Sequence, residues 1–99
     1  MKKIRLTLYI TGQTTKSLHA IENLKNLCKG EMKEKLDINI VDVLEHPQLA
    51  EDEKILATPT LVKSLPTPVR RIIGDLSQTE KVLLGLDLQF IEQKNEDTL

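Results

Sequence analysis

The sequence has few aromatic residues: one tyrosine, one phenylalanine and no tryptophan among 99 residues. Aliphatic side chains must therefore supply nearly all of the core packing, which an apolar share of 39% allows. Proteins that bind nucleic acid usually carry an excess of basic residues, and those that hold single strands also stack bases on aromatic side chains. Here 14 basic residues stand against 15 acidic ones. The composition therefore argues against nucleic-acid binding.

Cysteine is also scarce, because Cys28 is the only one. A single cysteine excludes an intrachain disulfide framework and makes a reducing cytoplasm the default location. No apolar run approaches the roughly 20 residues that span a bilayer. Lys2 and Lys3 precede alternating residues, unlike the continuous apolar stretch of a signal peptide. We therefore expect a cytoplasmic protein with no membrane span and, at this length, one domain.

The first half of the chain gives consistent signals for β–α–β. Residues 4–10 alternate apolar and polar side chains, which indicates a strand with one face on a core. Apolar residues then recur at helical spacing and predict an amphipathic helix over residues 16–29. The apolar segment 36–43 predicts a second strand. The link between the strands is long enough for a parallel crossover.

The second half carries every proline of the chain and gives less consistent signals. Pro47 and the polar residues after it predict a short helix with proline at its first position. Residues 69–76 predict a strand that runs into a turn. The sequence from Ser77 to Glu80 has the form of a capping box, so a helix should follow it.

The end of the chain combines an awkward glycine with a polar tail. The last helical face continues through Val82 and Leu86 to Phe90, and Gly85 lies inside it. Glycine costs about 1 kcal/mol relative to alanine in a helix interior. Residues 92–99 are polar and are expected to form a disordered tail, so we expect the domain to span residues 1–91.

The sequence offers no metal or phosphate site. The two histidines, His19 and His46, belong to no known metal-ligand spacing. The four glycines are scattered, so no glycine-rich loop is present to hold a phosphate. We expect no metal and no cofactor.

A β–α–β start followed by Thr58-Pro59-Thr60 suggests the thioredoxin architecture, in which such a proline is commonly cis beside the active site. Thioredoxin chemistry needs a low-pKa cysteine, usually in Cys-x-x-Cys, at the end of the first strand. Residues 11–16 contain no cysteine. Cys28 falls on the apolar face of the first helix, where we expect a small buried hydrophobe. The sequence predicts the fold without its chemistry.

One basic grouping stands out in the second half: Lys54, Lys63, Arg70 and Arg71. It fits a solvated face, and it also fits a surface that binds an acidic protein. Charge complementarity of the second kind mainly governs encounter rate and register. The residues alone leave both interpretations open.

Three stretches of the chain resemble one known family. They are residues 8–12 (Leu-Tyr-Ile-Thr-Gly), the segment 42–61 with Ala57-Thr58-Pro59-Thr60-Leu61 at its end, and the segment 68–88 that begins Pro-Val-Arg-Arg-Ile-Ile-Gly-Asp-Leu. The resemblance covers residues 6–90 without an evident gap. The family is KaiB.

The resemblance implies a non-enzymatic adaptor that exists in two folds. One is a tetrameric ground state, a dimer of dimers with order βαββααβ, which family habit favours. The other is a thioredoxin-like monomer with order βαβαββα. That monomer binds the N-terminal ATPase ring of the KaiC hexamer and modulates its phosphorylation state. In full clocks it also captures KaiA and displaces a histidine kinase with a thioredoxin-like sensor domain.

The resemblance also implies residues for the switch and for the partner. Gly85 and Asp87 fall in the segment where helix and strand compete, and glycine is poor in both. Pro59, Pro66 and Pro68 match family prolines whose isomeric states would differ between folds, which would make a switch slow. For contacts with KaiC we predict the basic grouping named above.

Departures from the family pattern leave alternatives open. The usual three-proline run appears here as Pro66-Thr67-Pro68, the helix from Lys16 to Lys29 differs most, and the tail lacks a dense acidic cluster. The chain could belong to a KaiB–KaiC pair without KaiA that serves stress adaptation. A sensor module of a histidine kinase and a divergent redox enzyme are further alternatives.

Overall fold

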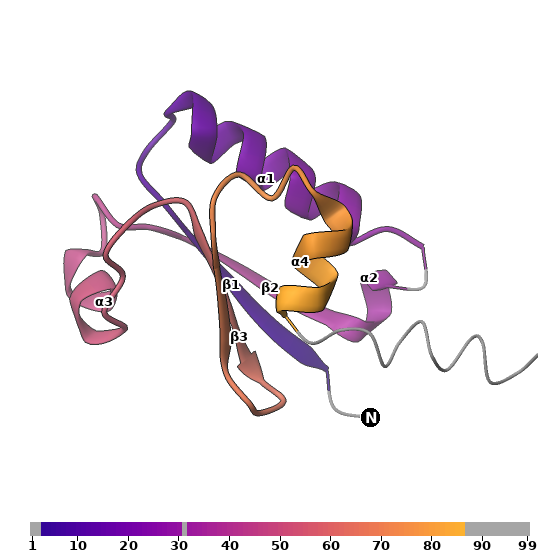
Figure 1. Ribbon diagram of the computed structural model, residues 1–99. Helices are drawn as coiled ribbons and strands as arrows, with labels where there is room; N and C mark the ends of the chain where they lie inside the picture. Colours follow the sequence, from indigo (N-terminus) through magenta and orange to yellow (C-terminus); the bar gives the residue numbers. More distant parts are fainter. Residues whose placement is uncertain (1–2, 31, 87–99) are drawn as a thin grey trace, which may run out of the picture.

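Residues 3–30 and 32–86 are described by the computed structural model of the chain (Figure 1). The elements are, in order, β1 (Ile4–Ile10), α1 (Thr15–Leu27), α2 (Met32–Lys35), β2 (Leu36–Asp42), α3 (Pro47–Asp52), β3 (Thr60–Leu65), β4 (Arg70–Ile73) and α4 (Thr79–Gly85). Apart from the four-residue α2, this is the order βαβαββα. The protein thus has the thioredoxin-like order and not the ground-state order that family habit favours.

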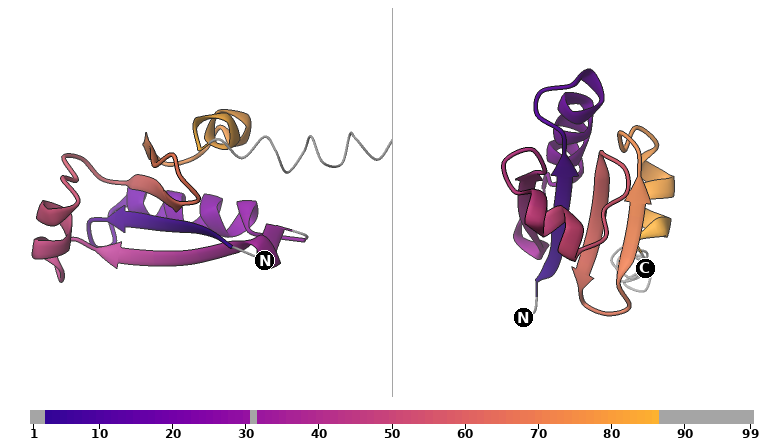
Figure 2. Two further views of the ribbon diagram at one scale, coloured as in Figure 1. Left: turned by 90° about the horizontal axis from the view of Figure 1, so that it is seen from below. Right: turned by 90° about the vertical axis from the view of Figure 1, so that its left-hand side faces the viewer.

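The four strands form one mixed sheet in the order β2-β1-β3-β4. β1 and β2 are parallel, as the crossover predicts, and their register runs from Ile4 opposite Leu36 to Ile10 opposite Asp42. β3 is antiparallel to both β1 and β4. α1 and α4 lie over the same face of this sheet (Figure 2). Among the elements of residues 3–30 and 32–86, no helix covers most of the other face, and α3 lies at one end of the sheet.

The hydrophobic core lies between the sheet and the two helices α1 and α4. Leu6 and Leu8 of β1 are fully buried, and Leu61 of the neighbouring β3 lies in the same cluster. Leu24 from α1 and Leu86 from the end of α4 close the core from the helical side. Burying one such leucine side chain contributes about 1.5–3 kcal/mol to stability. Aliphatic side chains therefore supply the core, as the composition predicts.

The first predicted helix is confirmed with small changes at its ends. It runs from Thr15 to Leu27, and Thr14 caps it by accepting a hydrogen bond from the Ser17 backbone N–H. Gly30 follows with φ +64°, a left-handed conformation that glycine adopts most easily. The short α2 lies in the crossover and was not predicted, because one turn gives no periodic signal.

The predicted capping box at the start of the last helix is wrong. The helix begins at Thr79, and its N-cap is Gln78, whose side chain makes no capping hydrogen bond. Ser77 lies in an earlier turn, where its backbone N–H donates to Asp75 Oδ1 at 3.1 Å and not to the side chain of Glu80, as a capping box requires. Leu76, with φ +65°, reverses the chain just before it. The carboxylate of Asp75 therefore accepts the hydrogen bond of the Ser77 backbone N–H before the helix begins.

Within the described residues, none of the helices has the length and apolarity required to cross a bilayer. The predicted tail, residues 92–99, lies outside the described part of the chain, as do Asp87 and Phe90.

Candidate partner-binding surface

The turn that ends α3 places Lys54 in an unusual backbone conformation. The Ile55 N–H donates to the Ala50 carbonyl at 2.8 Å, and the Lys54 N–H donates to the Glu51 carbonyl at 3.1 Å. These two bonds form a Schellman motif, whose left-handed position usually holds glycine. Lys54 occupies that position with φ +55°. A left-handed conformation costs a non-glycine residue about 1–2 kcal/mol.

Arg71 of β4 holds this turn from the side. Its Nη1 donates to the Lys54 carbonyl at 3.3 Å. Arg71 lies opposite Val62, on the sheet face that α1 and α4 leave uncovered. Both Lys54 and Arg71 are exposed. The bond therefore brings two predicted contact residues together, although 17 positions separate them in sequence.

Tyr9 lies beneath this turn and is only 7% exposed. Burial raises the pKa of its hydroxyl above the ordinary value, and the negative charge of Glu53 raises it further. The positive charge of Arg71 acts in the opposite direction. Sequence reasoning missed Tyr9 and Glu53 as parts of this surface, because no local pattern shows which loop will cover a strand.

Lys63 corrects the expectation of a single exposed basic grouping. It is 1% exposed, and β-strand alternation places it two residues from the buried Leu61 on the helix-covered face. Its cross-strand neighbour is Arg70, which is exposed. Like charges directly opposite each other in a sheet are destabilising. Lys63 therefore adds positive charge next to Arg70 but offers little surface for contact.

Three exposed cations thus remain from the predicted set: Lys54, Arg70 and Arg71. The structure brings Lys54 and Arg71 together, whereas Arg70 projects from the opposite, helix-covered face of the sheet, because side chains alternate along β4. Lysine and arginine offer only hydrogen-bond donors, and arginine can hold a carboxylate with two parallel bonds. The chemistry available to this surface is recognition of acidic side chains on another macromolecule. It has no nucleophile paired with a base.

The residues predicted for fold switching lie in three places. Pro59 is buried before β3, whereas Pro66 and Pro68 are exposed in the loop between β3 and β4. The peptide bonds preceding all three are cis. Gly85 ends α4, and a methyl group there would lie 3.0 Å from Ile72 Cδ1 and 3.1 Å from Ile72 Cγ1. Asp87 falls outside the described residues.

The position that holds cysteines in thioredoxins contains a hydroxyl network here. The Thr11 N–H donates to Ser17 Oγ at 3.1 Å, and Thr14 Oγ1 donates to Ser17 Oγ at 2.8 Å. Thr11 Oγ1 also contacts Thr58 Oγ1, next to Pro59. Cys28 is partly buried and packs against the core, as its place on the helix predicted. No group of His, Cys, Asp and Glu side chains within residues 3–30 and 32–86 has the geometry to hold a metal ion.

Comparison with known protein families and sequences gives a consistent result. The KaiB domain family matches residues 7–88. The chain is 54% identical over 88 residues to the circadian clock protein KaiB3 of Synechocystis, covering 89% of this chain and 86% of that one. It is 58% identical over 87 residues to the circadian clock oscillator protein KaiB of Prochlorococcus marinus subsp. pastoris, covering 88% and 81%.

Solved structures with the same fold include the N-terminal domain of SasA and thioredoxins. The N-terminal domain of Synechococcus elongatus SasA superposes with a TM-score of 0.71 at 24% identity, covering 94% of this chain and 87% of that one. Mitochondrial thioredoxin 3 of Saccharomyces cerevisiae superposes with a TM-score of 0.70 at 17% identity, covering 88% and 79%. At these identities the likeness shows the thioredoxin-like fold alone.

Proposed function

This chain belongs to the KaiB family, and on that premise we propose that it is a non-enzymatic, cytoplasmic clock regulator. In this proposal it binds the N-terminal ATPase ring of KaiC as a thioredoxin-like monomer and thereby modulates the phosphorylation state of KaiC. The curated relatives, named as circadian clock proteins, support the regulatory role. The proposed contact residues are Lys54 and Arg71 on one face of the sheet, and Arg70, with Lys63 beside it, at the same edge strand on the other face.

The conformation of Lys54 carries the assignment of this surface. A lysine stands where the backbone favours glycine. Strained residues cluster at sites of function, because the strain is otherwise a loss of stability. The Lys54 side chain is exposed and contributes nothing to the core. We therefore propose that lysine occurs at this position because its side chain contacts a partner. An acidic partner would also relieve the repulsion between Lys63 and Arg70.

Further partners follow from the same proposal. The shared fold of the SasA N-terminal domain supports competition between this chain and a histidine kinase with a KaiB-like sensor domain. Capture of KaiA belongs to the proposal only where the cell contains that protein. A KaiB–KaiC pair without KaiA, serving stress adaptation, would use the same contact with the ring.

Fold switching is part of the proposal, with the tetrameric form as the competing state. Gly85 and Asp87, together with Pro59, Pro66 and Pro68, are the residues we assign to it. Replacing Gly85 with alanine and Asp87 with arginine should favour the monomer and strengthen ring binding. An unchanged tetramer with unchanged affinity for the ring would contradict this assignment.

Charge reversal tests the contact surface directly. The variants Lys54→Glu and Arg70→Glu should each bind the isolated N-terminal ring of KaiC, with ATP present, at least about 10-fold more weakly. Lys16→Glu is the matched control, because Lys16 is exposed at the start of α1 and outside the surface. Affinity would be measured by fluorescence titration of labelled protein. Equal weakening by all three variants would reject the surface in favour of a general charge effect.

A further inference from the structure

A second cationic site lies at the opposite end of β1, on the sheet face without helices. A pocket of about 410 Å³ is present there. Its lining residues come from the start of β1 and the residue before it, from β2, and from the end of β3 and the loop that follows: Lys3, Arg5, Asp37, Leu65, Pro66 and Thr67. None of them belongs to the proposed contact surface for KaiC.

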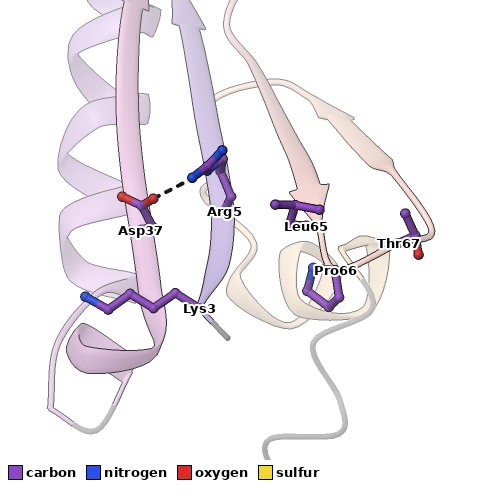
Figure 3. Close-up of a pocket in the computed structure, with 6 residues that line it drawn as sticks. All are labelled: Lys3, Arg5, Asp37, Leu65, Pro66 and Thr67. Carbon is purple, nitrogen blue, oxygen red and sulfur yellow. Dashed lines mark hydrogen bonds and ion pairs between the residues drawn. The ribbon is translucent and has the colours of Figure 1, made fainter. Parts of the chain in front are cut away.

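The floor of this pocket is formed by three neighbouring strands. Arg5 lies directly opposite Asp37 of β2 on one side and Leu65 of β3 on the other. The register between β1 and β3 shifts between Arg5 and Leu6, so pairing alone does not fix the side on which Leu65 lies. The side chains of Arg5, Asp37 and Leu65 nevertheless line the same pocket (Figure 3). Neighbouring strands lie about 4.8 Å apart. The charged and apolar parts of the floor are thus one strand spacing apart.

The charge balance of the pocket is positive. Arg5 Nε donates to Asp37 Oδ2 at 3.4 Å, which engages one edge of the guanidinium (Figure 3). The two terminal nitrogens of Arg5 make no hydrogen bond to any residue within the described ranges. Lys3 adds a second cation at the rim. Two cations with one carboxylate leave capacity for another carboxylate.

The exposure of the pocket decides which ligand fits. The side chains of Arg5 and Asp37 are 52% and 45% exposed. A small molecule would need about 70–90% of its surface buried, which this open site does not provide. A polypeptide can cover the ion pair from outside while one side chain enters the pocket. Leu65 (46% exposed) and Pro66 offer apolar surface beside the cations.

From this arrangement we infer that the pocket docks an extended acidic segment of a partner protein. A glutamate or aspartate of the segment binds Arg5 and Lys3, and an apolar side chain two residues away packs on Leu65. Side chains at positions i and i+2 of an extended chain lie on one face, about 6.6 Å apart, so two of them can reach side chains of two neighbouring strands, which lie about 4.8 Å apart. The site is independent of the proposed contact with KaiC.

The experiment uses a labelled probe peptide with the full chain. In the probe, glutamate and leucine alternate with serine over ten residues, and a second peptide has glutamine in place of glutamate. Binding would be followed by fluorescence anisotropy and by NMR shifts of backbone amides. We expect the acidic peptide to bind and to shift the amides of residues 3–7, 36–38 and 64–67. The glutamine peptide should not bind.

Three variants make the test specific. Arg5→Gln should weaken binding about 10-fold, since it removes a charge-assisted hydrogen bond. Asp37→Asn should strengthen binding about two- to three-fold, because it removes the competing carboxylate. The control Lys16→Gln removes one exposed positive charge elsewhere and should leave the affinity within about two-fold. Circular dichroism would confirm that each variant is folded.

Several results would overturn the inference. They are no binding of the acidic peptide, equal losses in Arg5→Gln and Lys16→Gln, weaker binding in Asp37→Asn, or free glutamate binding as tightly as the peptide. Ring binding of Arg5→Gln separates the two proposals, because we expect it to be unchanged. If Arg5→Gln lost both activities, the pocket would be part of the contact with KaiC and the inference of a separate site would be wrong.

Discussion

The two halves of this molecule differ in how strongly strand pairing and core packing stabilise a single fold. In the N-terminal half, residues 3–45, two seven-residue strands pair along their whole length beneath α1. In the C-terminal half, residues 46–86, β4 has four residues and α3 buries none. Both non-glycine residues with positive φ, Lys54 and Leu76, lie in the C-terminal half of the described chain.

This difference indicates where an alternative fold can arise. In the N-terminal half, β1 and β2 form backbone hydrogen bonds with each other along their whole length, and this half supplies most of the core side chains. The C-terminal half depends on β3 pairing with β1 and on a few core residues such as Leu61, Val82 and Leu86. A chain whose local signals agree has one deep minimum. The C-terminal half lacks that agreement, and the proposed switch would be confined to it.

Core truncations should separate the two halves most strongly. Leu8→Ala, in the central strand, should reduce the free energy of unfolding by about 2–5 kcal/mol and speed hydrogen exchange throughout the molecule. Leu86→Ala should cost a similar amount at its own site, because that side chain is also fully buried. Its effect on exchange should be confined to β4 and α4. Native-state hydrogen exchange would measure both.

A global effect of Leu86→Ala on hydrogen exchange would contradict the proposed difference between the two halves. If Leu86→Ala accelerated exchange in β1 and β2 as much as in α4, the two halves would unfold as one unit. A C-terminal switch that preserves the N-terminal half would then be ruled out.

Lys54→Gly tests whether the left-handed backbone at Lys54 lowers stability while its side chain contributes to partner binding. Glycine relieves the left-handed backbone, so the folded state should gain about 1 kcal/mol. The same change removes the side chain and should weaken ring binding. Urea unfolding and the ring titration would measure the two effects. Stabilisation without loss of binding would show that Lys54 is not a contact.

Gly85→Ala should have a smaller effect, because two contributions oppose each other. Alanine improves the helix by at most about 1 kcal/mol, while its methyl group meets Ile72 Cδ1 at 3.0 Å. Ile72→Val removes Cδ1, so Gly85→Ala should stabilise more in that background than alone. A double-mutant cycle of unfolding free energies would measure this coupling. A coupling of zero would mean that the contact is absent in solution.

Ionisation of Tyr9 should give the smallest and most local signal. Its pKa is raised above the ordinary value of 10.0, so the folded state holds this proton more tightly than the unfolded chain does. Stability should therefore fall as the pH rises above about 10. Glu53→Gln should lower the Tyr9 pKa, and Arg71→Gln should raise it further.

Tyrosinate absorbance can follow this titration without ambiguity, because Tyr9 is the only tyrosine. The signal connects the two halves, since Tyr9 lies in the first, and Glu53 and Arg71 lie in the second. Identical titration curves for the wild-type protein, Glu53→Gln and Arg71→Gln would place the α3–β3 turn away from Tyr9 in solution.

The sequence predicted much of the fold because its signals are local. Alternation along residues 4–10 and helical spacing after Thr14 gave β1 and α1 almost to their ends. The capping box failed because Asp75 competes for Ser77, which depends on a turn that the pattern does not show. Residue type identified the four predicted cationic residues, but it did not show which of their side chains are exposed. Lys63 is buried on the same face of β3 as Leu61, and Tyr9 is buried near Glu53, and both facts depend on contacts between segments distant in sequence.

We propose that this chain binds the KaiC ring as a thioredoxin-like monomer. The most direct test is size-exclusion chromatography with light scattering, first of the chain alone and then after prolonged incubation with the KaiC of the same organism and ATP. We expect a tetramer that converts slowly into a complex with one copy of this chain per ring subunit. A persistent monomer that never joins the ring would contradict this expectation and mean that the chain shares the family's fold but not the proposed function.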